Sequence, residues 1–425
     1  MADNQTGRTT GFLAASLSAS NLAGWILAFT PLILLIATWD SDGRLSQQAL
    51  ALRHYSFPVI AIEAFIVYAA WRNGFQPVAA FQRLPFFCRL LLFIWAAMAM
   101  WSALAFADDR AATMFVTLRY AGHILFFGAL IHLAQQCDDT QSWLKAMTLG
   151  GLGYVIGLTL FAVTVPDPSH FPWVPRMPSA TNIRQIGYFV AIIAVAPLSL
   201  VLFEPRLRTN AAIVLTIMTA FIAWSGSRGA LAGVVAASVF SVAILWKQVN
   251  RRGIIVAATT LICGIGASLV FPTPGPEFGL VRMAQSVSQD DFSTGRTQIW
   301  KDTIAEIKLS PIVGHGAGRF NKNMHEKYGF DYNHPHQGIL QFVYDWGIIG
   351  GIGAFTLLIY LLWTSIRSAL QDPVASRAFA GIAGLSTLGA VSMIDGPLFY
   401  PLSIVLALSL AAPLIAMRDR HELAA

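Results

Sequence analysis

The sequence carries little charge for its length. Only 12% of its 425 residues are charged and 56% are hydrophobic, whereas a soluble domain carries roughly twice that charged fraction. It also lacks low-complexity tracts and Gly/Ser-rich linkers, and its only long polar stretch is residues 272–335. These absences exclude a soluble enzyme, and we expect residues 1–425 to form a single integral membrane domain.

Cysteine and clustered basic charge are scarce as well. Cys88, Cys137 and Cys263 lie in or beside apolar runs, so we expect no disulfide and no cysteine metal site. The formal net charge is +6, but lysine and arginine form no patch or stripe, which excludes a nucleic-acid partner. No small-residue cleavage site follows the first apolar run, so we expect that run to be retained as a helix.

Long apolar runs are the main feature that is present. They recur from end to end at about 17–25 residues, the length that crosses ~30 Å of hydrocarbon, and they predict an all-α polytopic membrane protein of about twelve transmembrane helices. The predicted spans are 21–39, 55–72, 86–106, 113–134, 144–165, 183–203, 210–225, 228–246, 253–271, 337–363, 376–394 and 399–416. The second and seventh are short, and we interpret the tenth as a surface helix that continues into a span.

An even number of spans places both ends of the chain on one side of the membrane. The loops on that side hold more lysine and arginine than the short loops opposite, so the positive-inside rule makes it cytoplasmic. The 166–182 loop, the 225–228 turn and the 272–335 loop, between spans 9 and 10, then lie outside. In that last loop, Ser293 or Thr294 is predicted to cap an amphipathic helix at the membrane surface, whose apolar residues recur at helical spacing. These are Ile299, Trp300, Ile304 and Ile307.

Two arginines stand in apolar surroundings at the outer ends of predicted spans. Arg228 is the only charged residue between Thr209 and Trp246, and Arg184 opens the span that starts at 183. An intramembrane arginine is costly and usually functional, and guanidinium grips phosphate oxygens with two parallel hydrogen bonds. The pair therefore predicts a site for an anionic head group. The simpler interpretation is that each arginine reaches the membrane interface or pairs with a nearby carboxylate.

The end of the long loop, Asn333-His334-Pro335-His336-Gln337, offers a general base. Pro335 is typical of a helix start, which places His336 near the N-terminus of the tenth span, where the helix dipole favours a neutral imidazole. The alternative is a histidine satisfied by local backbone. Four histidines share the loop, but their spacing fits no familiar zinc pattern, so we expect no metal site.

These residues resemble the signature of the O-antigen ligase family, which includes O-antigen polymerases and O-linking oligosaccharyltransferases. Its motif is a histidine, then Asn, Ser or Gln, nine residues, glycine, two residues, and Gly, Thr or Tyr. This sequence has His336-Gln337, then Gly347 and Gly350 at that spacing. Upstream, Ser293-Thr294-Gly295-Arg296, Ile299-Trp300, and Gly314-His315-Gly316-Ala317-Gly318-Arg319-Phe320 resemble the rest of the family's large periplasmic loop.

The resemblance implies a metal-independent, inverting glycosyltransferase with a C-type membrane fold and no cofactor, in the bacterial inner membrane, with its active site facing the periplasm. The implied donor is undecaprenyl diphosphate carrying O-antigen, and the implied acceptor is lipid A–core oligosaccharide. His336 would be the catalytic base, and Arg184, Arg228 and Arg296 would bind the diphosphate. Arg319 and His334 are weaker candidates, because the first is typical of a surface residue and the second of a residue that orients the turn.

Three other functions remain open from the sequence. An O-antigen polymerase and an O-linking oligosaccharyltransferase use the same donor and differ in the acceptor, which no residue here reveals. A flippase for a lipid-linked sugar would also need arginines near a diphosphate, but along a path through both leaflets. The candidate charges gather at one face, which favours a transferase.

Overall fold

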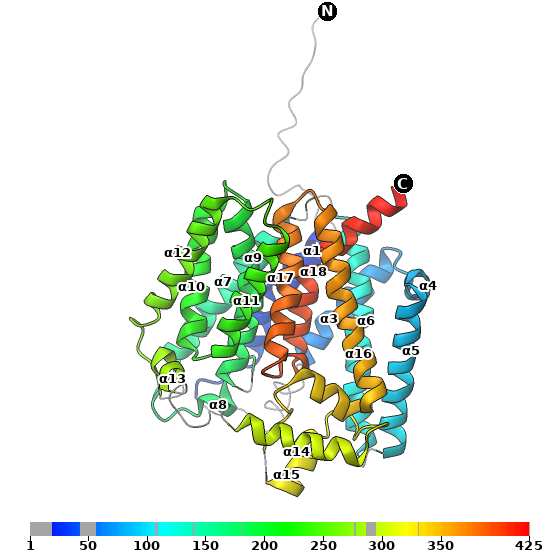
Figure 1. Ribbon diagram of the computed structural model, residues 1–425. Coiled ribbons are helices and arrows are strands. Elements are labelled where there is room, and N and C mark those ends of the chain that lie inside the picture. Colours follow the sequence, from blue (N-terminus) through cyan, green and yellow to red (C-terminus); the bar gives the residue numbers. More distant parts are fainter. Residues whose placement is uncertain are drawn as a thin grey trace, which may run out of the picture.

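The computed structural model describes residues 19–42, 57–106, 109–137, 139, 141–180, 182–275, 278–285, 295–329 and 331–424. All regular structure in these ranges is helical (Figure 1). The helices are α1 (Ala19–Ala37), α3 (Phe57–Arg72), α4 (Pro77–Arg83), α5 (Phe86–Trp101), the π-helical turn η1 (Ser102–Phe106), α6 (Arg110–Gln135), α7 (Gln141–Thr164), α8 (Trp173–Arg176), α9 (Ile183–Phe203), α10 (Arg208–Trp224), α11 (Arg228–Ile244), α12 (Arg251–Ala267), α13 (Gly279–Gln285), α14 (Arg296–Leu309), α15 (Phe320–Tyr328), α16 (Gly338–Gln371), α17 (Ala375–Ser392), the 3-10 turn η2 (Pro397–Phe399) and α18 (Pro401–Ala424).

Every predicted span corresponds to one helix, or to α5 with η1 for the span 86–106. Most ends differ by at most four residues, whereas α16 and α18 each extend eight residues beyond the predicted ends at 363 and 416. Seven helices of the described chain are long and apolar enough to cross a membrane, namely α1, α5 with η1, α6, α7, α9, α16 and α18. The apolar helices α10 and α11 are shorter. The chain is therefore a polytopic helical membrane protein, while the total of twelve spans stays a prediction.

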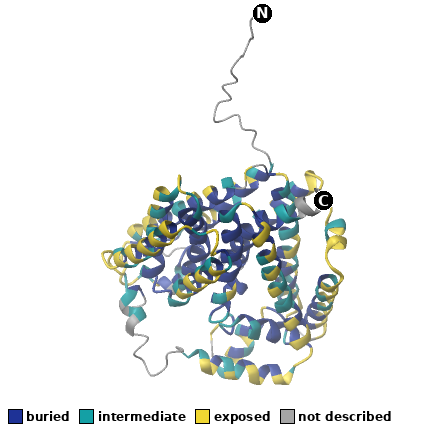
Figure 2. Ribbon diagram, turned by 45° about the horizontal axis from the view of Figure 1, so that its top comes forward, coloured by how far each residue is buried: buried dark blue, intermediate teal, exposed yellow. Residues whose placement is uncertain are grey.

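The most buried helices stand in the middle of the bundle. Nearly every residue of α9 is buried, and α17 and α18 pack against it and each other (Figures 1 and 2). The outer helices instead turn large apolar side chains outward: Phe93 of α5 is 71% exposed and Ile262 of α12 is 70% exposed. An apolar exterior of this extent is incompatible with water and fits lipid.

The two ends of the described chain lie at one end of the bundle. Just beyond α1, Thr38 accepts a hydrogen bond from the Ser179 backbone N–H at 2.7 Å, and Asp40 pairs with Arg176 at 2.9 Å. The start of α1 is therefore remote from the 166–182 loop, and α18 ends on the same side as that start, opposite the long-loop helices α14 and α15 (Figure 1). This arrangement agrees with the prediction that both ends of the chain lie on one side.

The helix expected in the long loop is α14, and part of its apolar side packs on α16. Ile299 and Ile307 are buried in a small core with Val343 and Tyr344 of α16, whereas Ile304 is 43% exposed. Contact with α16, rather than apolar spacing alone, therefore selects the buried face. The predicted caps at positions 293 and 294 lie outside the described residues.

The helix of the tenth predicted span, α16, is broken at Gly347. Within α16, Gly347 has φ 71° and ψ 175°, which interrupts the helical hydrogen bonds. The 311–316 loop replaces them: Ile348 N–H donates to the Pro311 carbonyl at 2.8 Å, and the Tyr344 carbonyl accepts from His315 N–H at 2.8 Å. The first turns of α16 are thus fixed to the long loop, and His336 lies at their start.

Candidate active site

His336 stands immediately before α16 in a strained backbone conformation. Its φ is 54°, a left-handed value that costs about 1–3 kcal/mol for a residue other than glycine. Gln337 caps the helix by accepting a hydrogen bond from Leu340 N–H at 2.6 Å, and His336 N–H donates to Nδ1 of His334 at 3.2 Å. These two contacts fix the strained turn before α16. They place His336 at the N-terminus of the helix, as the sequence predicted.

Asp395 orients the His336 ring. The two meet at 2.7 Å between Nδ1 and Oδ1, and Gly396 N–H donates to the same oxygen at 2.9 Å. Burial alone would raise the pKa of Asp395, but the charge and hydrogen bond of His336, joined by the charge of Arg296, outweigh it and hold that pKa well below its usual range. A carboxylate that accepts from Nδ1–H leaves Nε2 as the basic nitrogen, on a side chain that is 22% exposed.

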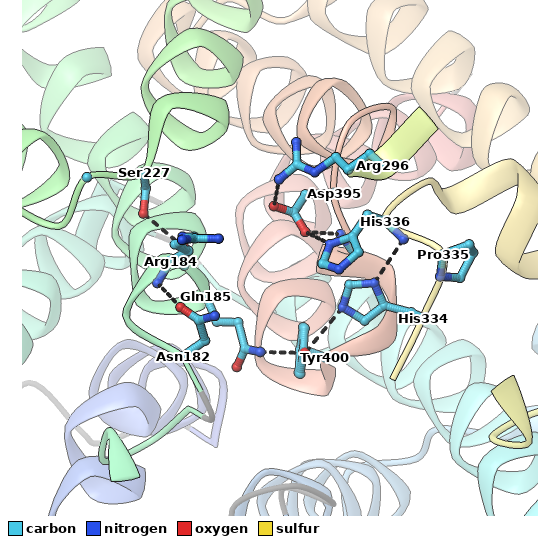
Figure 3. A network of polar contacts seen from close by, with 12 residues as sticks. Asn182, Arg184, Gln185, Ser227, Arg296, His334, Pro335, His336, Asp395 and Tyr400 are labelled. Carbon is cyan, nitrogen blue, oxygen red and sulfur yellow. Dashed lines mark hydrogen bonds and ion pairs between the residues drawn. The ribbon is translucent and has the colours of Figure 1, made fainter. Parts of the chain in front are cut away.

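Arg296 binds the second oxygen of the same carboxylate. It is the first residue of α14, and its Nη2 lies 3.0 Å from Asp395 Oδ2 (Figure 3). The buried carboxylate of Asp395 therefore contacts both His336, the candidate base, and Arg296, which is predicted to bind the diphosphate. Arg296 is half-buried, so its guanidinium still reaches the open side of the site.

Arg184 and Arg228 approach from the opposite side. Arg184 is the second residue of α9, and the Asn182 side chain caps the helix by accepting a hydrogen bond from Arg184 N–H at 2.9 Å. The Arg184 carbonyl accepts from Ser227 Oγ at 3.3 Å, which joins it to the turn before Arg228. Figure 3 shows the Arg184 side chain directed toward Asp395 and His336. The charges of Arg184 and Arg296 both act on Arg228, so the three predicted arginines converge.

The positive charge of Arg184 is not offset by an acid in the described part of the chain. Among the described residues, no carboxylate lies within ion-pair distance of Arg184, and its buried Nε has no hydrogen-bond partner. This excludes the interpretation that Arg184 is paired with a nearby acid. An unpaired guanidinium beside two further arginines is a site that an anion stabilises.

A fourth arginine supports the turn that carries Arg228. Arg282 of α13 donates from Nη1 to the Gly226 carbonyl at 3.0 Å, and Ser225 donates to Ser227 Oγ at 2.9 Å. Gly187 of α9 lies so close to this turn that an added Cβ would sit 2.2 Å from Ser227 Oγ. The turn is therefore packed directly on α9, as the glycines and serines around Arg228 allow.

His334 connects the His336 turn to the start of α9 through Tyr400. Because a backbone N–H can only donate, Nδ1 of His334 must accept from His336, and Nε2–H then donates to the Tyr400 oxygen at 3.3 Å. Gln185, next to Arg184, also donates to that oxygen. His334 thus orients the turn, in agreement with the simpler interpretation from the sequence.

Arg319, the other weaker candidate, lies elsewhere. It is buried where α15 begins, within electrostatic range of Tyr344 in the small core of the long loop. Its burial is contrary to the expectation of a surface residue. The loop glycines Gly314 and Gly316 have φ of 74° and 90°, so they provide the tight turn that docks on α16 rather than a phosphate cradle.

His334, His336 and Asp395 could in principle share a metal ion, since one ligand atom of each lies within 4.8 Å of the others. This grouping was not predicted from the sequence, because only the spacing of the loop histidines was considered as a metal site. Nδ1 of His334, Nδ1 of His336 and both oxygens of Asp395 already take part in protein hydrogen bonds, the last with the Arg296 guanidinium. A resident cation would have to displace these contacts beside three arginines, so the donor set does not favour a metal.

Three residues of this region were missed from the sequence. Asp395 is the only charged residue between the last two predicted spans, and Tyr400 lies at the start of the last one, 399–416. Arg119, buried in α6, donates to the Phe399 carbonyl at 3.1 Å. The sequence signal for Arg119 is the one used for Arg228, an arginine within an apolar run. The sequence signal for Asp395 is that it is the lone acid in the short connection between two predicted spans.

The fold and the site together define a polytopic membrane protein in which a histidine paired with a carboxylate and three converging arginines gather at one end of the bundle. Residues 211–355 match the family model described as O-antigen ligase. The resemblance drawn from the sequence is therefore confirmed, and the chain carries a domain of the O-antigen ligase family, whose members are glycosyltransferase-like enzymes acting on lipid-linked sugars. A comparison with curated proteins finds no match. The matched segment includes Arg228, Arg296 and His336, whereas Arg184 and Asp395 lie outside it.

Proposed function

We propose that this protein is an O-antigen ligase of the bacterial inner membrane. It transfers O-antigen polysaccharide from undecaprenyl diphosphate to lipid A–core oligosaccharide. The observation that carries the proposal is the oriented imidazole of His336, held by Asp395 at 2.7 Å and faced by Arg184, Arg228 and Arg296. A transfer from a diphosphate to a sugar hydroxyl needs these two kinds of group, a base for the acceptor and cations for the leaving group.

In the proposed mechanism, His336 Nε2 takes the proton of the acceptor hydroxyl as its oxygen attacks the anomeric carbon of the donor. The new glycosidic bond forms while the bond from that carbon to the diphosphate oxygen breaks. The electron pair of the broken bond leaves on undecaprenyl diphosphate, and the proton stays on His336. Asp395 stabilises the imidazolium that results.

The arginines stabilise the charge that grows on the leaving diphosphate. Arg184 and Arg228 are available to its oxygens from α9 and α11, and Arg296 from α14. Because guanidinium supplies this positive charge, the proposed reaction is metal-independent. A single displacement inverts the configuration at the anomeric carbon.

The remaining features of the proposal follow the sequence and the family. Twelve spans in a C-type membrane glycosyltransferase fold form one domain, residues 1–425. Both termini are cytoplasmic, and the 272–335 loop and the site face the periplasm. The acceptor reaches His336 from that side, while the donor lipid stays in the bilayer beside the arginines.

The deciding experiment uses purified protein in proteoliposomes with lipid-linked O-antigen and lipid A–core, without nucleotide and with a chelator. We expect O-antigen joined to lipid A–core, with an undiminished rate in the chelator. Longer glycan on the donor lipid would identify a polymerase, and transfer only to a protein hydroxyl would identify an O-linking oligosaccharyltransferase. Movement of intact donor across the bilayer without any joined product would identify a flippase, and activity restored only by a divalent ion would overturn metal independence.

A further inference from the structure

The segment 395–400 connects α17 to α18 and supplies the site at both of its ends. Asp395 binds His336, and Tyr400 binds His334. Between them lie the 3-10 turn η2 and Gly396, whose added Cβ would sit 2.1 Å from the His334 ring. The position of this segment therefore sets the position of the carboxylate that orients the base.

Two neighbouring side chains of α6 hold the middle of the segment. Arg119 donates from Nη2 to the Phe399 carbonyl at 3.1 Å, and Tyr120 donates from its hydroxyl to the Leu398 carbonyl at 2.9 Å. Both are buried, with 6% and 8% of their surface exposed. Each hydrogen bond fixes one carbonyl of the short turn.

Ring contacts add to these hydrogen bonds. The Arg119 guanidinium carbon lies 5.5 Å from the centre of the Phe399 ring, and that ring contacts the His334 ring at 5.5 Å. Asp345 of α16 is buried within electrostatic range of Arg119. The buried Arg119 side chain therefore faces the segment.

Tyr120 also connects the segment to α16. Its hydroxyl oxygen accepts from Gln341 Nε2 at 3.3 Å, one helical turn after Gln337 caps the helix. The same α6 side chain therefore contacts both parts of the chain that carry the His336–Asp395 pair. These parts are 59 residues apart in sequence, and Tyr120 bridges them from a third element, α6.

We propose that Arg119 and Tyr120 are positioning residues that align Asp395 with His336 for the transfer. This inference rests on the proposed function and assigns to α6 a role in it. The two residues touch neither substrate nor reacting atoms, and they act through the 395–400 segment. A misplacement of about 1 Å in such a pair lowers a rate on the order of 10²-fold.

The test compares Arg119→Met and Tyr120→Phe with His123→Asn in the proteoliposome assay. His123 lies one turn further along α6 and is equally buried, but it binds Glu63 of α3 at 2.6 Å instead of the segment. We expect kcat to fall about 10²-fold for Arg119→Met and about 10-fold for Tyr120→Phe, with KM for donor and acceptor within about twofold. Arg119→Lys, which keeps one donor and the charge, should recover part of the rate, and His123→Asn should retain it.

A double substitution separates positioning from general stability. If Arg119 acts through Asp395, Arg119→Met combined with Asp395→Asn should be no slower than Asp395→Asn alone. Losses that multiply, or a loss in His123→Asn as large as that in Tyr120→Phe, would overturn the inference. So would normal kcat in both α6 variants while the wild-type protein transfers glycan. A wild-type protein that joins no glycan to any acceptor would instead overturn the proposed function.

Discussion

Asp395 has two oxygens and uses each for a different part of the site. One orients His336 at 2.7 Å and the other holds Arg296 at 3.0 Å. The helix dipole was the only influence on His336 that the sequence revealed, and the Asp395 carboxylate is a second one that acts on the same ring. Asp395 escaped sequence reasoning because its partner is 59 residues away and contacts of that range have no local pattern.

Replacing Asp395 with asparagine should slow transfer on the order of 10²–10⁴-fold, the range that a well-placed acid–base group contributes. The amide no longer fixes the Nδ1–H tautomer or stabilises the imidazolium. The measurement is kcat in proteoliposomes. Asp372→Asn is a matched control, because Asp372 pairs with Arg377 at 2.6 Å at the other end of α17, and it should affect thermal stability without this loss of kcat per folded protein.

The pH dependence of the same residue has a defined sign. The folded-state pKa of Asp395 is held below its ordinary value of 3.8, so the stabilisation it contributes is complete above about pH 4 and is lost only as the pH falls further. Asp395 therefore keeps its charge from pH 5 to 9, and the acidic limb of the rate profile in that range reports another group. A thermal-stability difference between wild type and Asp395→Asn that vanished already at pH 6 would contradict this sign.

Arg228→Lys should lower the transfer rate by about 10–100-fold, because a point charge cannot make two parallel bonds to the diphosphate, and one charged hydrogen bond contributes about 1.5–3 kcal/mol. Donor-dependent kinetics measure the effect. The matched control is Arg252→Lys, since Arg252 is exposed in the first turn of α12. Unchanged donor kinetics in Arg228→Lys would remove this residue from the diphosphate site.

At the scale of elements, the sequence predicted the helices well and their contacts poorly. Apolar runs determine where a helix crosses lipid, so the position of each predicted helix agrees with the structure. The buried face of α14 depends on α16, which the run of apolar residues cannot show. The motif glycine Gly347 looked like part of a signature, and the structure gives its physical reason: an added Cβ would sit 1.9 Å from the Ile312 carbonyl oxygen.

Gly347→Ala should therefore destabilise the protein and displace the 311–316 loop. The left-handed φ alone costs at least about 1–3 kcal/mol for alanine, and the clash adds to it. Gly353→Ala is the control, because a Cβ there meets nothing within 4 Å and alanine favours the helix. Thermal unfolding in detergent should show a lower midpoint for the first variant and an equal or higher one for the second; equal midpoints would contradict the docking of the loop.

For the whole molecule, the apolar exterior follows from composition, but the side of the membrane does not follow from the fold. Glu326 in the long-loop helix α15 and Lys247 just after α11 are both exposed. The helix α15 lies at the opposite end of the bundle from the C-terminal end of α11 (Figure 1). Cysteine at position 326 should react with an impermeant maleimide supplied from the periplasm, and cysteine at position 247 only after the membrane is opened. The reverse labelling would place the site in the cytosol, where the proposed acceptor is not joined.

The most direct measurement is single-turnover transfer by His336→Asn in proteoliposomes that hold lipid-linked O-antigen, with lipid A–core as the acceptor. Asparagine tolerates the left-handed backbone at this position better than alanine, so the variant removes the base while the turn before α16 is retained. We predict that donor binding persists and that the rate falls on the order of 10²–10⁴-fold. A rate near that of the wild type would contradict the account, because the oriented imidazole would then not be the base.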